Sequence, residues 1–205
     1  IFLTSKLWYD DLRSGKVVEA MVASLKRLGM VYVNLYLVHW PVKETYVSVW
    51  KKMEAVYKSG KAKAIGVSNY QTHHLADLLE EAEIIPAVNQ IECYPYLSQA
   101  ATIQYCLERN IRPEAWGPLG AGKSDILTNP VITEIAKKRG LTPAQVVLGW
   151  NLERGVIVIP KSIHKERLTE NLKCTDFELT DEDMTRISAL NKNLRLGADP
   201  DHFNF

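Results

Sequence analysis

Short apolar runs alternate with longer amphipathic stretches along the whole chain. The runs are residues 1–5 (IFLTS), 32–38 (YVNLYLV), 64–67 (AIGV), 87–89 (AVN), 114–115 (EA) and 156–160 (VIVIP). Strands of a parallel sheet are buried on both faces, so each of them is expected to be apolar nearly throughout. The alternation therefore predicts about six parallel strands, each followed by a helix.

The stretches between these runs carry apolar residues at helical spacing. Val17, Met21, Leu25 and Leu28 form one such series, which stops at Gly29, where a helix C-terminus favours glycine. Further series are Val47, Trp50, Met53 and Tyr57, closing near Gly60; His74, Leu75, Leu78 and Leu79; and Ser98 with Ile103 and Leu107. Two capping patterns, Thr142-Pro143 with Gln145 and Leu179-Thr180 with Asp183 and Met184, predict two more helix starts.

Polar or large aromatic residues close each apolar run. They are Lys6, His39, Ser68 with Asn69, Gln90, Trp116, and Lys161 with Ser162. The carboxyl ends of parallel strands meet at one end of a barrel, so these residues predict a shared enzyme site there. A closed (β/α) barrel has eight strands. Because the chain opens directly into a strand at Ile1, we expect two further units before it.

An open doubly wound sheet is the structural alternative, since it also alternates strands and helices. It usually binds a dinucleotide through a GxGxxG turn after an early strand. This sequence has no such turn, and the glycine-rich residues 117–122 (GPLGAG) come late and have a different spacing. The barrel is therefore preferred.

Composition excludes several classes of protein. The 205 residues are 46% hydrophobic, as expected of one ordinary domain, residues 1–205, with a terminal tail at 192–205. With 25 Lys+Arg against 24 Asp+Glu, charge gives no reason to expect nucleic acid or an anionic membrane as partner. The absence of a long apolar stretch and of a signal peptide favours the cytosol. Three scattered cysteines, Cys93, Cys106 and Cys174, are expected to be reduced and buried.

Six motifs together resemble the aldo-keto reductases. They are TSKLW (4–8), LYLVHWP (35–41), AIGVSNY (64–70), NQIE (89–92), EAWGPLGAGK (114–123) and IPKSIHKERLTEN (159–171). The resemblance covers essentially the whole chain, and the short loop from Pro41 to Tyr46 is most similar to a bacterial and protozoan branch. That branch includes 2,5-diketogluconate reductases and prostaglandin F synthase-like reductases. The resemblance implies a (β/α)8 TIM barrel, here without its first two units, and a monomer that transfers hydride from NADPH to a small aldehyde or ketone.

The resemblance also implies roles for residues at the strand ends. Lys6 matches the lysine that lowers the pKa of a tyrosine acid, since a nearby cation stabilises the phenolate. His39 matches the histidine that orients the substrate carbonyl. Trp8 and Trp40 would form part of an aromatic substrate wall.

The cofactor residues implied by the resemblance fall into two groups. Ser68, Asn69 and Gln90 would hold the nicotinamide carboxamide, and Trp116 would stack on the ring. Gly117, Pro118, Leu119 and Gly120 would approach the pyrophosphate. Lys161, Ser162, Arg167, Glu170 and Asn171 would bind the adenosine end at a helix start, where anions are favoured. Lys161 and Arg167 match the pair that contacts a 2′-phosphate, which favours NADPH over NADH. No metal is expected.

One departure from the family pattern affects the expected activity. The catalytic tyrosine and aspartate of the family lie in a DTA…Y…NE-type segment, which nothing in this sequence matches. We therefore expect these 205 residues alone to be poorly active and prone to aggregation. Two alternatives stay open: a protein that binds NADPH without turnover, and a Schiff-base lyase that uses Lys6 or Lys161 as nucleophile.

Overall fold

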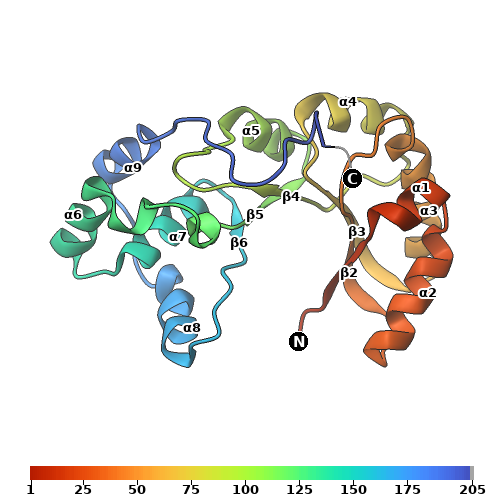
Figure 1. The fold of residues 1–205 in the computed structure, drawn as a ribbon, viewed down its shortest axis with the longest axis horizontal. Coiled ribbons are helices and arrows are strands. Elements are labelled where there is room, and N and C mark those ends of the chain that lie inside the picture. The colour runs from red at the N-terminus through yellow and green to blue at the C-terminus, as the bar shows by residue number, and fades with distance from the viewer. Residues whose placement is uncertain (204–205) are drawn as a thin grey trace. The chain divides into compact units, whose positions relative to one another are not determined.

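The computed structural model describes residues 1–203. Neighbouring strands follow one another in chain order, and the first strand pairs with the second, the second with the third, the third with the fourth and the fifth with the sixth, all in parallel (Figure 1). They are β1 (Thr4–Leu7), β2 (Val33–Val38), β3 (Ala62–Ser68), β4 (Val88–Glu92), β5 (Arg112–Trp116) and β6 (Ile157–Val158). The helices are α1 (Tyr9–Ser14), α2 (Val17–Leu28), α3 (Tyr46–Lys58), α4 (Thr72–Glu81), α5 (Ala100–Glu108), α6 (Pro130–Arg139), α7 (Pro143–Glu153), α8 (Lys165–Leu172) and α9 (Asp181–Ser188). Short 3₁₀ turns lie at Gly120–Gly122, Ile126–Thr128 and Lys173–Thr175.

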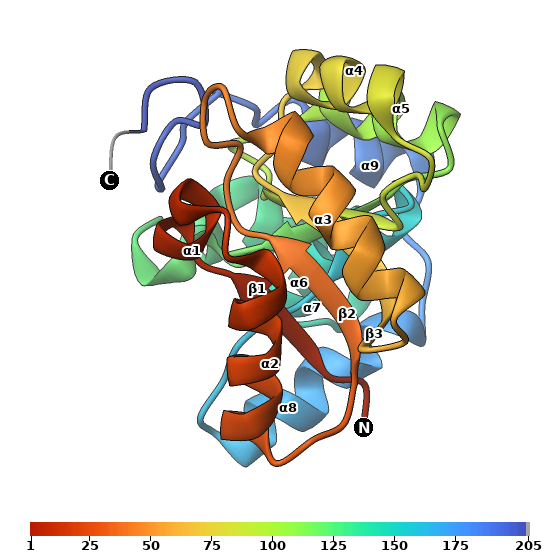
Figure 2. The ribbon, with the colours of Figure 1, turned by 90° about the vertical axis from the view of Figure 1, so that its right-hand side faces the viewer.

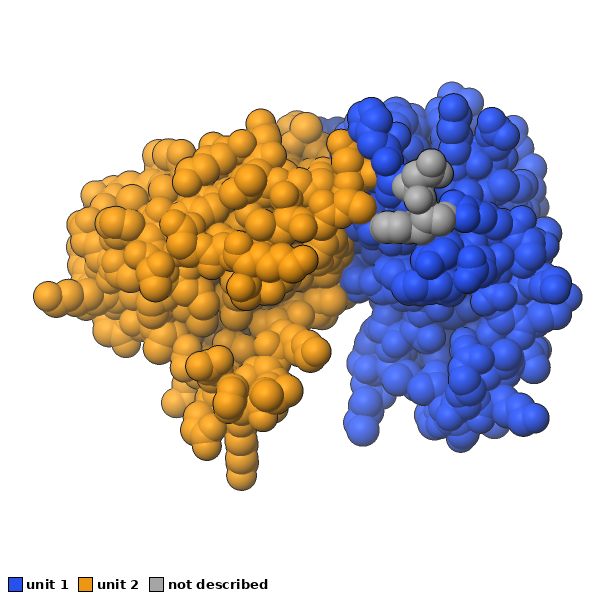
Figure 3. Space-filling view, viewed as in Figure 1, with its two compact units in different colours: residues 1–90, 105–111, 200–205 blue, residues 91–104, 112–199 orange. Residues whose placement is uncertain are grey.

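The chain divides into two compact units (Figure 3). Unit 1 contains residues 1–90 and 105–111 together with the described tail from residue 200 to 203. Unit 2 contains residues 91–104 and 112–199. The single-domain organisation expected from the sequence stays a prediction. Of the predicted tail, residues 204–205 lie outside the described residues.

Unit 1 is built around strand β2, whose side chains are buried on both faces. Tyr36 and Val38 belong to the large core cluster that includes α2 and α3, whereas Leu35 and Leu37 pack with Val88. This split follows from the two-residue period of a strand, which sends successive side chains to opposite faces. Helices α2 and α3 lie against one face of the strands (Figure 2). The predicted apolar run is therefore confirmed as a strand, and its residues Leu35 to Val38 are buried.

Unit 2 packs its helices around a second core that includes Ile91, Ala115, Val147 and Trp150. Both predicted capping boxes are present. The Thr142 hydroxyl accepts from the N–H of Gln145 at the start of α7, and the Thr180 hydroxyl accepts from the N–H of Asp183 at the start of α9. These caps replace hydrogen bonds that the first turn of a helix lacks.

Several boundaries differ from the predicted ones. Lys6 and Gln90 lie inside β1 and β4 rather than after them, and the run 156–160 contains only a two-residue strand. The helix expected from Ser98 begins at Ala100. Helices α1 and α6 were not predicted. Helix α1 is six residues long and has few apolar residues. Helix α6 carries helical signals that were missed, namely Ile132, Ile135 and Ala136 between a cap at Asn129 and Gly140.

All three cysteines are buried and none forms a disulfide among the described residues, as expected. No described helix is both long enough and apolar enough to cross a membrane.

Candidate active site

Four of the predicted residues form one hydrogen-bonded group in unit 1. The Lys6 ammonium donates to the Gln90 side-chain oxygen, and the Ser68 hydroxyl donates to the Gln90 main-chain oxygen at 2.9 Å. The Asn69 N–H donates to the same main-chain oxygen at 2.8 Å, and its side-chain amide donates to the Ser68 hydroxyl at 3.2 Å. Ser68, Asn69 and Gln90 are at most 4% exposed. Their contacts fix the orientation of each side chain.

Asn69 makes this arrangement possible because its backbone is left-handed, with φ 64°. Asparagine tolerates this conformation better than most residues, and it turns the chain sharply at the end of β3. The turn lets the Asn69 side chain reach across to the main-chain oxygen of His39 at 3.1 Å. The ends of β2 and β3 are thus joined at the predicted site.

His39 follows β2 and lies half-buried beside Trp8, with ring centroids 4.9 Å apart. Burial, and then the positive charge of Lys6, lower the pKa of His39 to about 4. Its imidazole is therefore neutral near pH 7, when one ring nitrogen donates and the other accepts. The buried Nδ1 atom has no hydrogen-bond partner within the described structure. A neutral imidazole can still donate one hydrogen bond to a polar substrate group.

Aromatic rings continue from His39 into the tail. The Trp40 ring lies 6.1 Å from the His39 ring and 4.7 Å from the Phe203 ring, measured between centroids. Trp8 is 48% exposed, whereas Trp40 is buried. Both tryptophan rings therefore lie near the His39 ring, and their role as a substrate wall stays a prediction.

Unit 2 brings together the predicted residues for the adenosine end. A cavity of about 820 Å³ is lined by Leu119, Gly122, Lys161, Ser162, Arg167, Glu170 and Asn171, among others. Lys161 and Ser162 follow β6, and Arg167 lies in the first turn of α8. The Thr142 hydroxyl donates to the Glu170 carboxylate at 2.5 Å, which connects the cap of α7 to the cavity wall. The cavity therefore combines two cations with a helix N-terminus and a glycine-containing loop.

The remaining predicted residues do not line this cavity. Gly117, Pro118 and Gly120 belong to the same loop as Leu119 but are not among the lining residues. Gly120 instead packs against Ser124, where a Cβ at residue 120 would come 2.7 Å from the Ser124 Cβ. Trp116 is half-buried at the end of β5, beside the chain at Gly197.

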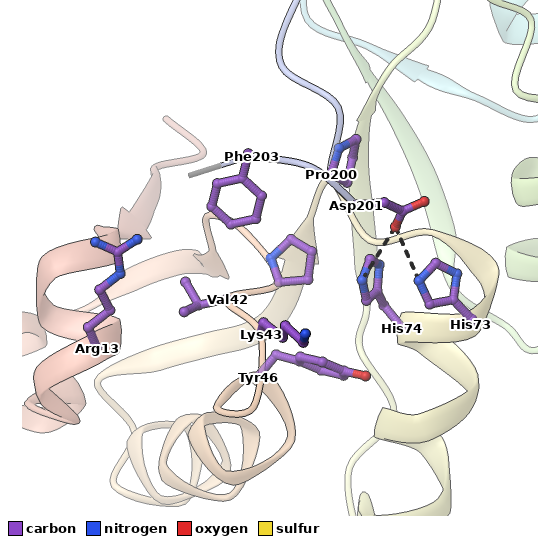
Figure 4. Close-up of a pocket in the computed structure, with 10 residues that line it drawn as sticks. Arg13, Val42, Lys43, Tyr46, His73, His74, Pro200, Asp201 and Phe203 are labelled. Carbon is purple, nitrogen blue, oxygen red and sulfur yellow. Dashed lines mark ion pairs between the residues drawn. The ribbon is translucent and has the colours of Figure 1, made fainter. Parts of the chain in front are cut away.

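A histidine cluster in unit 1 was not predicted. His73 and His74 lie in the first turn of α4. The Asp201 carboxylate lies 3.1 Å from the His73 Nε2 atom and 3.6 Å from the His74 Nε2 atom (Figure 4). The three side chains border a cavity of about 510 Å³ that Phe203 also lines. The adjacent histidines at a helix start were the one signal that could have been noticed, but Asp201 lies too far along the chain to be connected with them.

The hydrogen bonding of His74 argues against metal binding by this cluster, although the three ligand atoms lie within 4.8 Å of one another. The His74 Nδ1 atom accepts from the backbone N–H of Gln71 at 3.1 Å. In the neutral ring the proton must then be on Nε2, the atom that faces Asp201. A protonated nitrogen cannot ligate a metal. Burial, and then His73, lower the pKa of His74 to about 4, so the neutral ring dominates near pH 7.

Comparison with known proteins gives a consistent result. Residues 1–192 match the Aldo/keto reductase family. The chain is 48% identical over 205 residues to the glyoxal reductase of Bacillus subtilis, covering 100% of this chain and 74% of the relative. It is 44% identical over 204 residues to the 9,11-endoperoxide prostaglandin H2 reductase of Trypanosoma cruzi, covering 99% of this chain and 72% of the relative. The predicted bacterial and protozoan resemblance is confirmed.

A solved structure supports the same assignment. The aldo-keto reductase of the silkworm, Bombyx mori, in its complex with NADPH, matches with a TM-score of 0.90 at 37% identity, covering 95% of this chain and 65% of that protein. This likeness and the parallel strands in chain order confirm the predicted fold class, part of a (β/α)8 barrel. The chain belongs to the aldo/keto reductase family.

Proposed function

We propose that the chain is an NADPH-dependent reductase of small aldehydes and ketones. The observation that carries this proposal is the cavity of unit 2, which Lys161, Ser162 and Arg167 line together. Its two cations suit a phosphate group, and the planar arginine can also stack on a base. NADPH carries both a 2′-phosphate and an adenine. The donors present in the cavity therefore fit the adenosine end of this cofactor.

The group in unit 1 fits the nicotinamide end. Ser68, Asn69 and Gln90 supply buried hydroxyl and amide groups of the kind that recognise a carboxamide. Their orientation is already fixed by contacts with one another, so binding would cost little reorganisation. We assign Trp116 to the face of the ring and residues 117–120 to the pyrophosphate, on the family resemblance.

The reaction assigns a role to each side chain. NADPH, when bound, supplies the hydride that reduces the carbonyl carbon. Neutral His39 donates a hydrogen bond to the carbonyl oxygen and orients it. Lys6 stabilises the phenolate of a tyrosine acid, which the motifs of this chain do not include. Trp8 and Trp40 exclude water from the carbonyl group.

The substrate class follows from a relative and from the site. One relative is named a glyoxal reductase, and glyoxal is a small dicarbonyl compound. We propose small aldehydes, glyoxals and keto sugars as the substrate class, since the polar groups of unit 1 provide donors for a carbonyl oxygen.

Fluorescence titration with NADPH, followed by its absorbance decay with glyoxal, tests the proposal. Both are measured on the 205-residue chain and on a version extended at its N-terminus by the tyrosine-bearing segment of a relative. We expect both to bind NADPH more tightly than NADH, and the extended version to oxidise NADPH. Tight binding without turnover in either version would support a binding protein instead. Trapping of the substrate on a lysine by borohydride would support a lyase.

A further inference from the structure

The segment 191–197 runs alongside the loop after β4, and a series of hydrogen bonds within unit 2 holds it there. The Asn191 side chain accepts a hydrogen bond from the Ser98 N–H at 3.0 Å. The N–H groups of Lys192 and Leu194 both donate to the Tyr96 main-chain oxygen, each at 3.0 Å. The Tyr94 hydroxyl donates to the Leu194 main-chain oxygen at 2.9 Å. These four hydrogen bonds, two of which join main-chain atoms, set the path of the segment. Its last contacts are made by Glu92.

Glu92 holds two consecutive peptide groups with one carboxylate. Its Oε1 atom accepts from the Leu196 N–H at 2.7 Å and its Oε2 atom accepts from the Gly197 N–H at 3.0 Å. Glu92 is 1% exposed, and no cation among residues 1–203 forms an ion pair with it. A buried carboxylate needs strong donors. These two N–H groups supply them, so the carboxylate and the peptide fix one another.

Gly197 lies directly against the indole of Trp116. A Cβ at residue 197 would come 2.6 Å from the Trp116 Cη2 atom, 3.2 Å from its Cζ2 atom and 3.1 Å from the Glu92 Oε2 atom. Real Cβ atoms essentially never come within 3.0 Å of another atom, so a side chain at residue 197 would force the indole or the backbone to shift. The backbone held by Glu92 is therefore the surface on which one end of the indole packs.

We propose that Glu92 is a positioning residue for Trp116. It acts through the peptide between Leu196 and Gly197, and it restricts the orientations open to the indole ring. The consequence for cofactor binding rests on the proposed function, in which Trp116 packs on the nicotinamide. The positioning itself does not, because it is a property of the chain without any ligand.

A measurement without NADPH tests the positioning. The five tryptophans are labelled with 5-fluorotryptophan, and a Trp116→Phe variant identifies the ¹⁹F resonance of Trp116. In Glu92→Gln, an amide NH₂ replaces one carboxylate oxygen and faces a backbone N–H, so one hydrogen bond is lost. We expect the Trp116 resonance to shift or broaden while those of the other tryptophans stay. An unchanged Trp116 resonance in Glu92→Gln would overturn the proposal.

Two further variants keep the test decisive. Tyr94→Phe removes a hydroxyl that binds the same segment at Leu194 but leaves the Glu92 contacts, so the Trp116 resonance should stay in place. Gly197→Ala keeps the carboxylate and pushes directly on the indole, so the Trp116 resonance should move as in Glu92→Gln. If Glu92→Gln does not fold, Gly197→Ala decides: no response of Trp116 there would overturn the proposal.

Titration with NADPH then separates the positioning of Trp116 by Glu92 from the proposed binding of the cofactor. We expect Glu92→Gln to weaken NADPH binding about tenfold, the effect of one lost hydrogen bond to a charged group. In the Trp116→Phe background the same substitution should change the Kd less than about twofold, because the indole it positions is gone. Equal effects in both backgrounds would overturn positioning through Trp116. If wild type fails to bind NADPH while its Trp116 resonance responds to Glu92→Gln, the proposed function fails and the positioning stands.

Discussion

The two groups of predicted cofactor residues differ in how firmly they are held. In unit 1, Ser68, Asn69 and Gln90 are buried and bonded to one another, so each has one orientation. In unit 2, Lys161 and Arg167 are exposed around an open cavity. Exposed cations attract anions over a distance but are screened by salt. The comparison indicates that the first group suits orientation of a reacting ring and the second suits capture of a charged ligand.

The largest expected effect comes from Lys6, which is hydrogen-bonded to Gln90 in the group of unit 1. Lys6→Met removes the cation that would stabilise the phenolate of the tyrosine acid. We expect the turnover of the extended version to fall about a hundredfold or more, in the range usual for acid catalysis. Steady-state kinetics with glyoxal measures this loss.

A matched lysine serves as the control for Lys6. Lys63 lies on β3 outside the group, with its ammonium 4.7 Å from the Tyr32 ring centroid. Lys63→Met should keep the turnover of the parent. Equal losses in the two variants would contradict a specific role for Lys6.

The next largest effect is expected from Lys161 and Arg167, the two cations at the cavity of unit 2. The double variant Lys161→Ala/Arg167→Ala removes both cations from the cavity. We expect the Kd for NADPH to rise about a hundredfold, since each hydrogen bond between charged groups contributes about 1.5–3 kcal/mol and solvent screening reduces the sum. Binding of NADH, which has no 2′-phosphate, should change far less.

Lys165→Ala is the control for the double variant. Lys165 is exposed at the start of α8 but does not line the cavity. It should leave both dissociation constants near those of wild type, and the salt dependence of NADPH binding should persist. A parallel loss for NADH and NADPH in the double variant would remove the argument for the 2′-phosphate.

A pH dependence sharpens the comparison further. The pKa of His39 is about 4 in the folded chain because of burial and Lys6, against an ordinary value near 6.5. Between these values the unfolded chain binds a proton that the folded chain does not. The contribution of His39 to the free energy of unfolding should therefore fall as the pH decreases from about 6.5 to 4, and this contribution should change no further below pH 4.

Urea unfolding of wild type and His39→Gln at several pH values measures this effect. The variant should lose less stability than wild type over the same range. Some dependence should remain, because the pKa of His74 is lowered in the same direction. Identical slopes for the two proteins would show that the folded His39 titrates normally.

The smallest effect concerns the cap at the cavity of unit 2. Thr142→Ala removes both the cap of α7 and the hydrogen bond to Glu170, and should cost about 1 kcal/mol of stability. Thr180→Ala removes the matching cap of α9, which does not line the cavity, at a similar cost. Only Thr142→Ala should also weaken NADPH binding. Thermal unfolding and NADPH titration of both variants measure the difference.

Much of the fold could be predicted because local signals agreed with it. The apolar series Val17, Met21, Leu25 and Leu28 predicted both ends of α2 correctly, and Gly29 adopts the expected left-handed conformation. The capping boxes at Thr142 and Thr180 located two more helix starts. By contrast, the strand predicted for residues 156–160 is longer than the observed β6, which contains only Ile157 and Val158. Apolar residues alone do not determine where the pairing of a strand ends.

The site was predicted less completely. The residues after β2 and β3 lie together because parallel strands end at one edge, a rule that can be applied to sequence. The contact between Glu92 and the peptide at Gly197 follows no such rule, since it joins residues 105 positions apart. The same holds for His73, His74 and Asp201. Contacts of this kind depend on the path of a loop, which local patterns do not specify.

The distance along the chain between Glu92 and its donors also has a consequence for biosynthesis. A ribosome that adds about 5–20 residues per second needs roughly 5–20 s to travel from Glu92 to Gly197. During that interval the carboxylate has neither of its two peptide donors, and burying it unpaired would be unfavourable. The end of β4 must therefore stay hydrated in the nascent polypeptide. The surroundings of Trp116 are completed only after the ribosome has added Gly197.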